Sequence, residues 1–202
     1  DTFIQSPGVQ WEFNRAAWSV VASGQKNFRA RWEPWGDETP PCPSPGSCLA
    51  DFDPGQKTYE TYEFSVAKQV FLPLFQKLRF EAMWQTGSRL DRFSEFQFSF
   101  FGNRVRGFSG SGVRYDRGGI VRAQYAFNIA NVIRFDASLD RARVRDALTS
   151  DDFHSFTGFG ISGNMMGPWE TVLQFDVGVA LQSDFEPLRG GTEFQIGLLK
   201  YF

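Results

Sequence analysis

The chain has 202 residues, which suits one domain, and its formal net charge of −2 gives no general attraction to nucleic acid. Aromatic residues make up 17% of the chain, yet its mean hydropathy is −0.33. Large apolar side chains in a chain that is polar on average indicate strands with one apolar and one polar face. The sequence lacks the run of about 18 apolar residues that a transmembrane helix needs, but a barrel strand needs only about ten alternating residues.

The N-terminal segment holds two alternating runs, which begin at Val9 and at Ala16 and differ in phase. One bulged strand, or two short pieces, would produce this shift of phase. We expect a turn at Ser23-Gly24-Gln25, after which the regular strands begin. Residues 1–26 are therefore interpreted as a separate N-terminal segment, either a further strand or a plug, ahead of a barrel domain at 27–202.

The first long loop, from Glu33 to Lys57, contains Cys42 and Cys48, separated by five residues rich in proline, serine and glycine. A small disulfide loop is feasible there and would suit an oxidising compartment. A metal site is less favoured, because the only histidine, His154, is far away in the sequence. The start of the chain, which lacks a basic and apolar leader, would fit a mature secreted protein.

Eight alternating strands are expected from residue 27 onward, at 28–32, 62–72, 78–85, 121–128, 133–140, 157–162, 173–181 and 194–202. Short and long connections alternate between them, and the longest internal one, 86–119, is rich in glycine and arginine. A rim of tight turns opposite a rim of long loops is typical of outer-membrane barrels, whereas a soluble sandwich has mixed loops at both ends. We therefore expect an all-β fold, a transmembrane antiparallel β-barrel of about eight strands, with residues 1–26 as a ninth strand or a plug.

Several short motifs resemble those of one family. They are Val105-Arg106-Gly107-Phe108 in the long loop, Arg134-Phe135-Asp136-Ala137 in a strand, Met166-Gly167-Pro168 in a turn, and the alternating C-terminal run that ends on an aromatic residue. In this order, with five strands after the loop, they resemble the C-terminal part of Omp85-superfamily barrels over about residues 58–202. In such a barrel the last strand forms the insertion signal and an openable seam, here at Phe194, Ile196, Gly197, Leu198, Tyr201 and Phe202.

The resemblance implies that the loop folds back into the barrel and that Arg106 pairs with an inward-facing acid. Asp136 is the preferred partner and Asp140 the second. In the alternative interpretation Arg106 is solvated, and Asp136 pairs with a neighbouring arginine such as Arg122 or Arg134. A charge-assisted pair in a partly water-excluded lumen would pin the loop.

The resemblance also implies a function in the bacterial outer membrane, in contact with its lipid. The chain would insert or translocate unfolded or secreted polypeptide, or lipid, through its strand seam, without enzyme activity, cofactor or metal. The family's barrels have more strands and are preceded by soluble domains. Side chains just fill an eight-stranded barrel, which leaves no room for the loop, so we expect a homodimer through the first and last strands.

Two other functions remain open from the sequence. The chain could be a small passive outer-membrane barrel, acting as an anchor or a narrow pore without macromolecular transport. It could also be a barrel-borne lipase that uses His154 and a serine. Because His154 lies beside Asp151 and Asp152, an acid–base cluster is conceivable, but a lone histidine beside loop acids is usually solvated.

Overall fold

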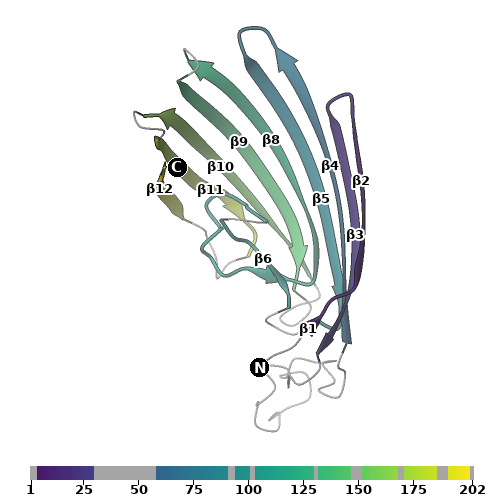
Figure 1. Ribbon diagram of the computed structural model, residues 1–202. Helices are drawn as coiled ribbons and strands as arrows, with labels where there is room; N and C mark the ends of the chain where they lie inside the picture. The colour runs from purple at the N-terminus through teal and green to yellow at the C-terminus, as the bar shows by residue number, and fades with distance from the viewer. Residues whose placement is uncertain are drawn as a thin grey trace.

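The computed structural model describes residues 4–29, 58–90, 94–100, 103–129, 132–146, 152–167, 171–185 and 191–200, and these residues form an all-β structure (Figure 1). The strands are β1 (Ile4–Gln5), β2 (Gly8–Arg15), β3 (Trp18–Arg29), β4 (Thr58–Leu72), β5 (Gln76–Ser88), β6 (Phe96–Gln97), β7 (Arg114–Tyr115), β8 (Arg117–Ile129), β9 (Ile133–Arg145), β10 (Phe153–Met166), β11 (Thr171–Ser183) and β12 (Thr192–Lys200).

One antiparallel sheet contains every strand except β6 and β7, which pair with each other. Its order is β1-β3-β4-β5-β8-β9-β10-β11-β12, and β2 pairs with β3 beside β1 on the same edge. The sheet therefore has nine strand positions, each antiparallel to its neighbour, in a curved wall of long strands (Figure 1).

A barrel of about eight strands per chain was expected, with a homodimer contact through the first and last strands, and in the described residues no hydrogen-bonded pairing joins β12 to β2. The wall is open, and β2 and β12 are its edges. The physical reason lies on the inner face, defined here as the face on which residues 94–116 pack. Because side chains alone fill a closed eight-stranded barrel, a sheet that also holds this segment needs a wider curve.

The alternation of connections is confirmed. Short turns at 16–17, 73–75, 130–132 and 167–170 alternate with long connections at 30–57, 89–116, 146–152 and 184–191. The strand ends joined by short connections lie at the upper end of the sheet in Figure 1, and those joined by long connections lie at the lower end. Strands β3, β4, β5, β8, β9, β10 and β11 are 12 to 15 residues long and exceed the sequence-based ranges at most ends.

The N-terminal segment contributes β1, β2 and most of β3 to the sheet. β2 and β3 are joined by a two-residue turn at Ala16 and Ala17, whose φ angles are 49° and 63°. Positive φ at both positions is the geometry of a type I′ hairpin turn, and this turn explains the shift of phase. The turn expected at Ser23-Gly24-Gln25 is wrong, because β3 continues through it, so residue 26 lies inside a strand.

The two faces of the sheet differ in chemistry. On the outer face, cross-strand neighbours such as Phe80, Ala123, Leu139, Phe159 and Val179 lie in one register row. Many large apolar side chains on this face are exposed, whereas the opposite residues are largely polar or charged. No helix among the described residues is long and apolar enough to cross a membrane.

Candidate functional site

Residues 94–116 fold as a compact segment against the inner face of the sheet. Its two short strands pair Phe96 with Tyr115 and Gln97 with Arg114. Apolar side chains from the segment and the sheet form one buried cluster, made up of Phe98, Val105, Phe108, Val113, Tyr115, Ile120, Ala142, Val144 and Phe156. Edge-to-face ring contacts join Phe156 of β10 to Phe98 and Phe108, so the segment is packed and not merely tethered.

The motif Val105-Arg106-Gly107-Phe108 forms a tight turn at the centre of this segment. The Phe108 amide donates a hydrogen bond to the Val105 carbonyl at 3.0 Å. Gly107, the third residue, has a φ of +82°, which only glycine adopts without strain. A Cβ on Gly107 would lie 2.1 Å from the backbone nitrogen of Ala180 in β11. The turn thus places Arg106 directly against the sheet.

Arg106 is buried in an ion pair with Asp140 of β9. Arg106 Nη1 lies 3.0 Å from Asp140 Oδ2 and 3.2 Å from Oδ1, and the Arg106 amide donates to Oδ2 at 3.1 Å. The Asp140 side chain is 0% exposed and that of Arg106 is 6% exposed. Removing one partner of such a pair costs on the order of 3–5 kcal/mol, because the other charge stays buried. We call this contact the latch.

Two further arginines complete the charge network around the latch. Arg122 Nε donates to Asp140 Oδ1 at 2.7 Å, and Arg122 also lies 3.6 Å from Glu81 Oε2. Arg104 Nη1 donates to Asp176 Oδ2 of β11 at 2.9 Å. Glu81 Oε2 also lies 3.3 Å from Arg79 Nη2, so the network sets four guanidinium groups against three carboxylates.

Glycines of β10 and β11 make room for the turn. A Cβ on Gly158 would lie 1.8 Å from the Arg106 carbonyl oxygen, and one on Gly160 would lie 2.1 Å from Arg106 Cδ. Gly178 faces the same turn, with 3.0 Å between its notional Cβ and the Gly107 nitrogen. The register between β10 and β11 also shifts at Thr157/Gly158, and such bulges often lie beside functional sites.

Tyr115 anchors the far end of the segment. Its hydroxyl donates to Gln85 Oε1 at 2.7 Å, and Gln85 Nε2 donates to Glu63 Oε2 at 2.7 Å. Burial, with a smaller contribution from the Glu63 charge, raises the pKa of Tyr115. The hydroxyl therefore stays protonated and remains a donor.

The predicted site residues fall into three groups. Arg106 is docked, as in the preferred interpretation, but on Asp140 and not on Asp136. Asp136 instead pairs with Arg134, whose Nη2 lies 2.8 Å from Asp136 Oδ1. Arg134 lies two residues before Asp136 on the same strand. The turn is instead seated at Gly158, the register partner of Asp140, which places Arg106 beside that aspartate.

The predicted seam residues lie on β12, which pairs only with β11 in the described residues. Phe194, Ile196 and Leu198 project on the outer face with 62–70% of their surface exposed. Gly197 lies at an inner-face position of β12. Four predicted residues, Tyr201, Phe202, Cys42 and Cys48, lie outside the described part of the chain.

His154 lies at the start of β10, away from the latch. Its Nδ1 is 3.6 Å from Asp184 Oδ1, and its ring packs on Phe185 with 4.6 Å between centroids. No serine hydroxyl in the described residues is hydrogen bonded to His154. The arrangement required for a histidine-activated serine is therefore not assembled there.

Sequence reasoning missed the glycines that receive the turn. Gly158, Gly160 and Gly178 were interpreted only as small residues in alternating strands. The alternation of the sequence could have indicated them, because all three glycines fall at polar-face positions of two neighbouring strands. A patch without side chains on that face indicates the close approach of another backbone.

No protein-family model matches the chain, and no curated protein matches it. Among solved structures, it is similar to the COG4313 outer membrane channel from Pseudomonas putida F1, at 12% sequence identity and a TM-score of 0.46. The similarity covers 98% of this chain and 63% of the channel, so the chain spans less than two thirds of that protein's length. A likeness at this level assigns no activity to the chain.

Proposed function

We propose that the chain forms the wall of a bacterial outer-membrane β-barrel with a narrow pore, restricted by residues 94–116. The observation that carries this proposal is the buried latch between Arg106 and Asp140 on the polar face of a sheet whose opposite face is apolar and exposed. A charged network on the inner face suits a water-lined lumen, and the apolar outer face suits lipid.

Two features support the membrane placement: short and long connections join opposite ends of the strands, and the strands are long enough to span a membrane. Thirteen residues of β9, at about 3.3 Å each and a tilt of about 40°, span roughly 33 Å of membrane height. That height exceeds the apolar band of about 25 Å in outer-membrane barrels, so both strand ends reach the interfaces. The short turns would then face the periplasm and the long connections the outside.

Planar-bilayer conductance tests this proposal. The wild-type chain is expected to give a small, steady conductance, and Arg106→Ala to give larger and noisier openings because the segment is released. Arg134→Ala is the matched control, since it removes an inner-face arginine that does not hold the segment. Equal conductance in wild type and Arg106→Ala would contradict a pore restricted by the latch.

A second candidate function is the insertion or translocation of polypeptide at the outer membrane, as in the Omp85 superfamily. It is favoured by the place of Val105-Arg106-Gly107-Phe108, the motif of the family resemblance, at the latch itself. The open edges of β2 and β12 also offer templates for a substrate strand. Faster insertion of an unfolded barrel protein into liposomes that contain the chain would support this function, and an unchanged rate would exclude it.

We also propose that further strands cover the edges of the wall in the membrane, because unpaired backbone groups are costly in lipid. Eight antiparallel pairings separate β2 from β12, so the two edge strands run in the same direction. A second copy in the same orientation would therefore meet each edge in parallel, whereas an odd number of other strands would close the wall with antiparallel pairs. Mass measurement in mild detergent distinguishes these two arrangements, since only the pairing with a second copy gives a dimer.

A further inference from the structure

Four arginines lie at outer-face positions of β8 and β9, near the long connections: Arg117, Arg141, Arg143 and Arg145, of which Arg145 pairs with Asp116 at 2.8 Å. Arg141 lies opposite Val121 and Thr157, and Arg143 lies opposite Gly119 and Ser155. Arg117 lies one register row beyond, at the start of β8. These positions share the parity of the exposed apolar residues, so the guanidinium groups stand on the surface assigned to lipid.

Arg141 and Arg143 differ from the arginines of the inner face in their partners. Among the described residues, neither has an ion pair with a carboxylate, whereas Arg104, Arg106 and Arg122 are all paired. Among the residues that the structure describes, the polar contact of the two is a cation–π contact, in which the Arg143 guanidinium lies 5.6 Å from the centre of the Phe153 ring. Within the described part of the chain, these two positive charges thus have no carboxylate partner, whereas Lys26 on the same face pairs with Glu60.

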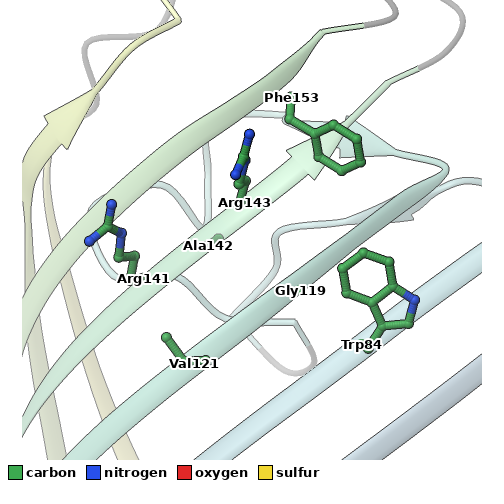
Figure 2. Close-up of a pocket in the computed structure, with 7 residues that line it drawn as sticks. All are labelled: Trp84, Gly119, Val121, Arg141, Ala142, Arg143 and Phe153. Carbon is green, nitrogen blue, oxygen red and sulfur yellow. The ribbon is translucent and has the colours of Figure 1, made fainter.

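A hollow of about 500 Å³ opens between these arginines and two aromatic residues (Figure 2). Trp84 and Phe153 flank it, and Gly119 leaves its floor without a side chain. A second hollow, of about 620 Å³, shares Arg141 and Val121 with the first and continues over an apolar lining that includes Phe80, Ala123 and Leu139. The first has the chemistry of a headgroup site and the second that of an acyl-chain groove.

The positions of Arg141 and Arg143 along β9 fit a headgroup site beside an acyl-chain groove. Arg143 and Arg141 lie two and four residues before the end of β9, or about 7 and 13 Å along the strand. In the proposed membrane placement Arg143 lies near the boundary between headgroups and hydrocarbon and Arg141 lies deeper, from where its long side chain can extend toward the interface. Arginine pairs with phosphate through two parallel hydrogen bonds, which makes it well suited to this anion.

We propose that Arg141 and Arg143, with Trp84 and Phe153, bind the phosphate headgroup of an anionic membrane lipid, with an acyl chain in the adjoining hollow. The proposal rests on the membrane placement given above. The bound lipid would be a specific component of the wall and not part of a freely exchanging solvent layer.

The test uses the full chain in nanodiscs of phosphatidylcholine, alone or mixed with phosphatidylglycerol, with retained lipid measured by native mass spectrometry. The wild type is expected to retain phosphatidylglycerol in preference to phosphatidylcholine. The double variant Arg141→Gln/Arg143→Gln should reduce that preference about tenfold or more, at roughly 1 kcal/mol per interfacial charge. Lys26→Gln is the matched control, because this outer-face cation already pairs with Glu60 at 3.3 Å and should leave the preference unchanged.

Each outcome bears on a separate claim. Uptake of all three proteins into discs with equal lipid preference would overturn the lipid site and leave the membrane placement intact. Failure of the wild type to enter any disc would overturn both. Displacement of the lipid by millimolar inorganic phosphate would show that the arginines bind anions in general. It would therefore also overturn the assignment of this site to a lipid.

Discussion

The carboxylate of Asp140 accepts hydrogen bonds from the side chain and the backbone amide of Arg106, and none of its side-chain surface is exposed. Asp136, four residues earlier on the same strand, has the same charge but pairs with a half-exposed arginine. The two aspartates lie on the same face of β9, but only Asp140 binds an arginine of residues 94–116. Substituting each in turn therefore gives a matched comparison.

Asp140→Asn is expected to release residues 94–116, because two guanidinium groups, Arg106 and Arg122, lose their shared carboxylate. The buried charges left behind should lower the free energy of unfolding by about 3–5 kcal/mol. Limited proteolysis of detergent-solubilised protein, together with urea unfolding, measures both effects. Asp136→Asn leaves only the half-exposed Arg134 without its carboxylate, and water can solvate that charge, so it should cost less than Asp140→Asn and leave protease resistance intact.

Gly158→Ala should prevent docking of the turn without altering the charges. The added Cβ would meet the Arg106 carbonyl oxygen at 1.8 Å, and because the contact is with backbone, the turn must move. The expected result is a protease-sensitive segment in a sheet that still forms. Gly197→Ala is the control, since its Cβ would have no neighbour closer than 3.9 Å. Equal protease resistance in both variants would mean that the segment is not held at this point.

Ile161→Lys tests which face meets lipid. Ile161 lies on the outer face of β10 and is 44% exposed, so in a bilayer the lysine would stand in hydrocarbon. The expected loss of stability in lipid vesicles is about 2–4 kcal/mol. Gln124→Lys places the same charge on the inner face near Asp136, where it should cost much less. If the two variants were equally stable, the assignment of the faces would be wrong.

Tyr115 links stability to alkaline pH. Its pKa is raised by burial in the folded chain, so folding favours the neutral hydroxyl. The corresponding stability is fully present below the unfolded pKa of about 10 and is lost progressively as the pH rises above it. Absorbance titration of phenolate should show one tyrosine that ionises only when the segment opens.

Tyr115→Phe removes that titration and leaves Gln85 without its donor. We expect a cost of about 1–3 kcal/mol at neutral pH and a shallower loss of stability above pH 10 than in the wild type. Parallel alkaline profiles for the two proteins would contradict the role assigned to the buried hydroxyl.

Most of the wall was accessible from the sequence because alternation has a period of two and the strand faces differ sharply. Runs such as Ile133 to Asp140 could be assigned to strands and their faces at once. The N-terminal region was misjudged because the two-alanine turn at Ala16 and Ala17 carries none of the glycine or asparagine that usually marks a type I′ turn. Conversely, Ser23-Gly24-Gln25 has turn composition but lies within a strand, where Gly24 accommodates the ring of Tyr62.

The candidate site could be predicted in kind but not in detail. The motif indicated that Arg106 would dock, and parity placed Asp136 and Asp140 on the correct face. The choice between them depends on where the turn that carries Arg106 is seated on the sheet, which is set by Gly158, Gly160 and the irregular register beside them. Those relationships join distant parts of the chain and leave no trace in local patterning.

The latch also sets an order of events during folding. Arg106 and Asp140 are 34 residues apart, and Arg104 and Asp176 are 72 residues apart, so the receiving surface exists only after β9, β10 and β11 have paired. Contacts between such distant residues form slowly, because long loops must close first. Docking of the segment is therefore a late step, and its completion marks a sheet that has finished assembling.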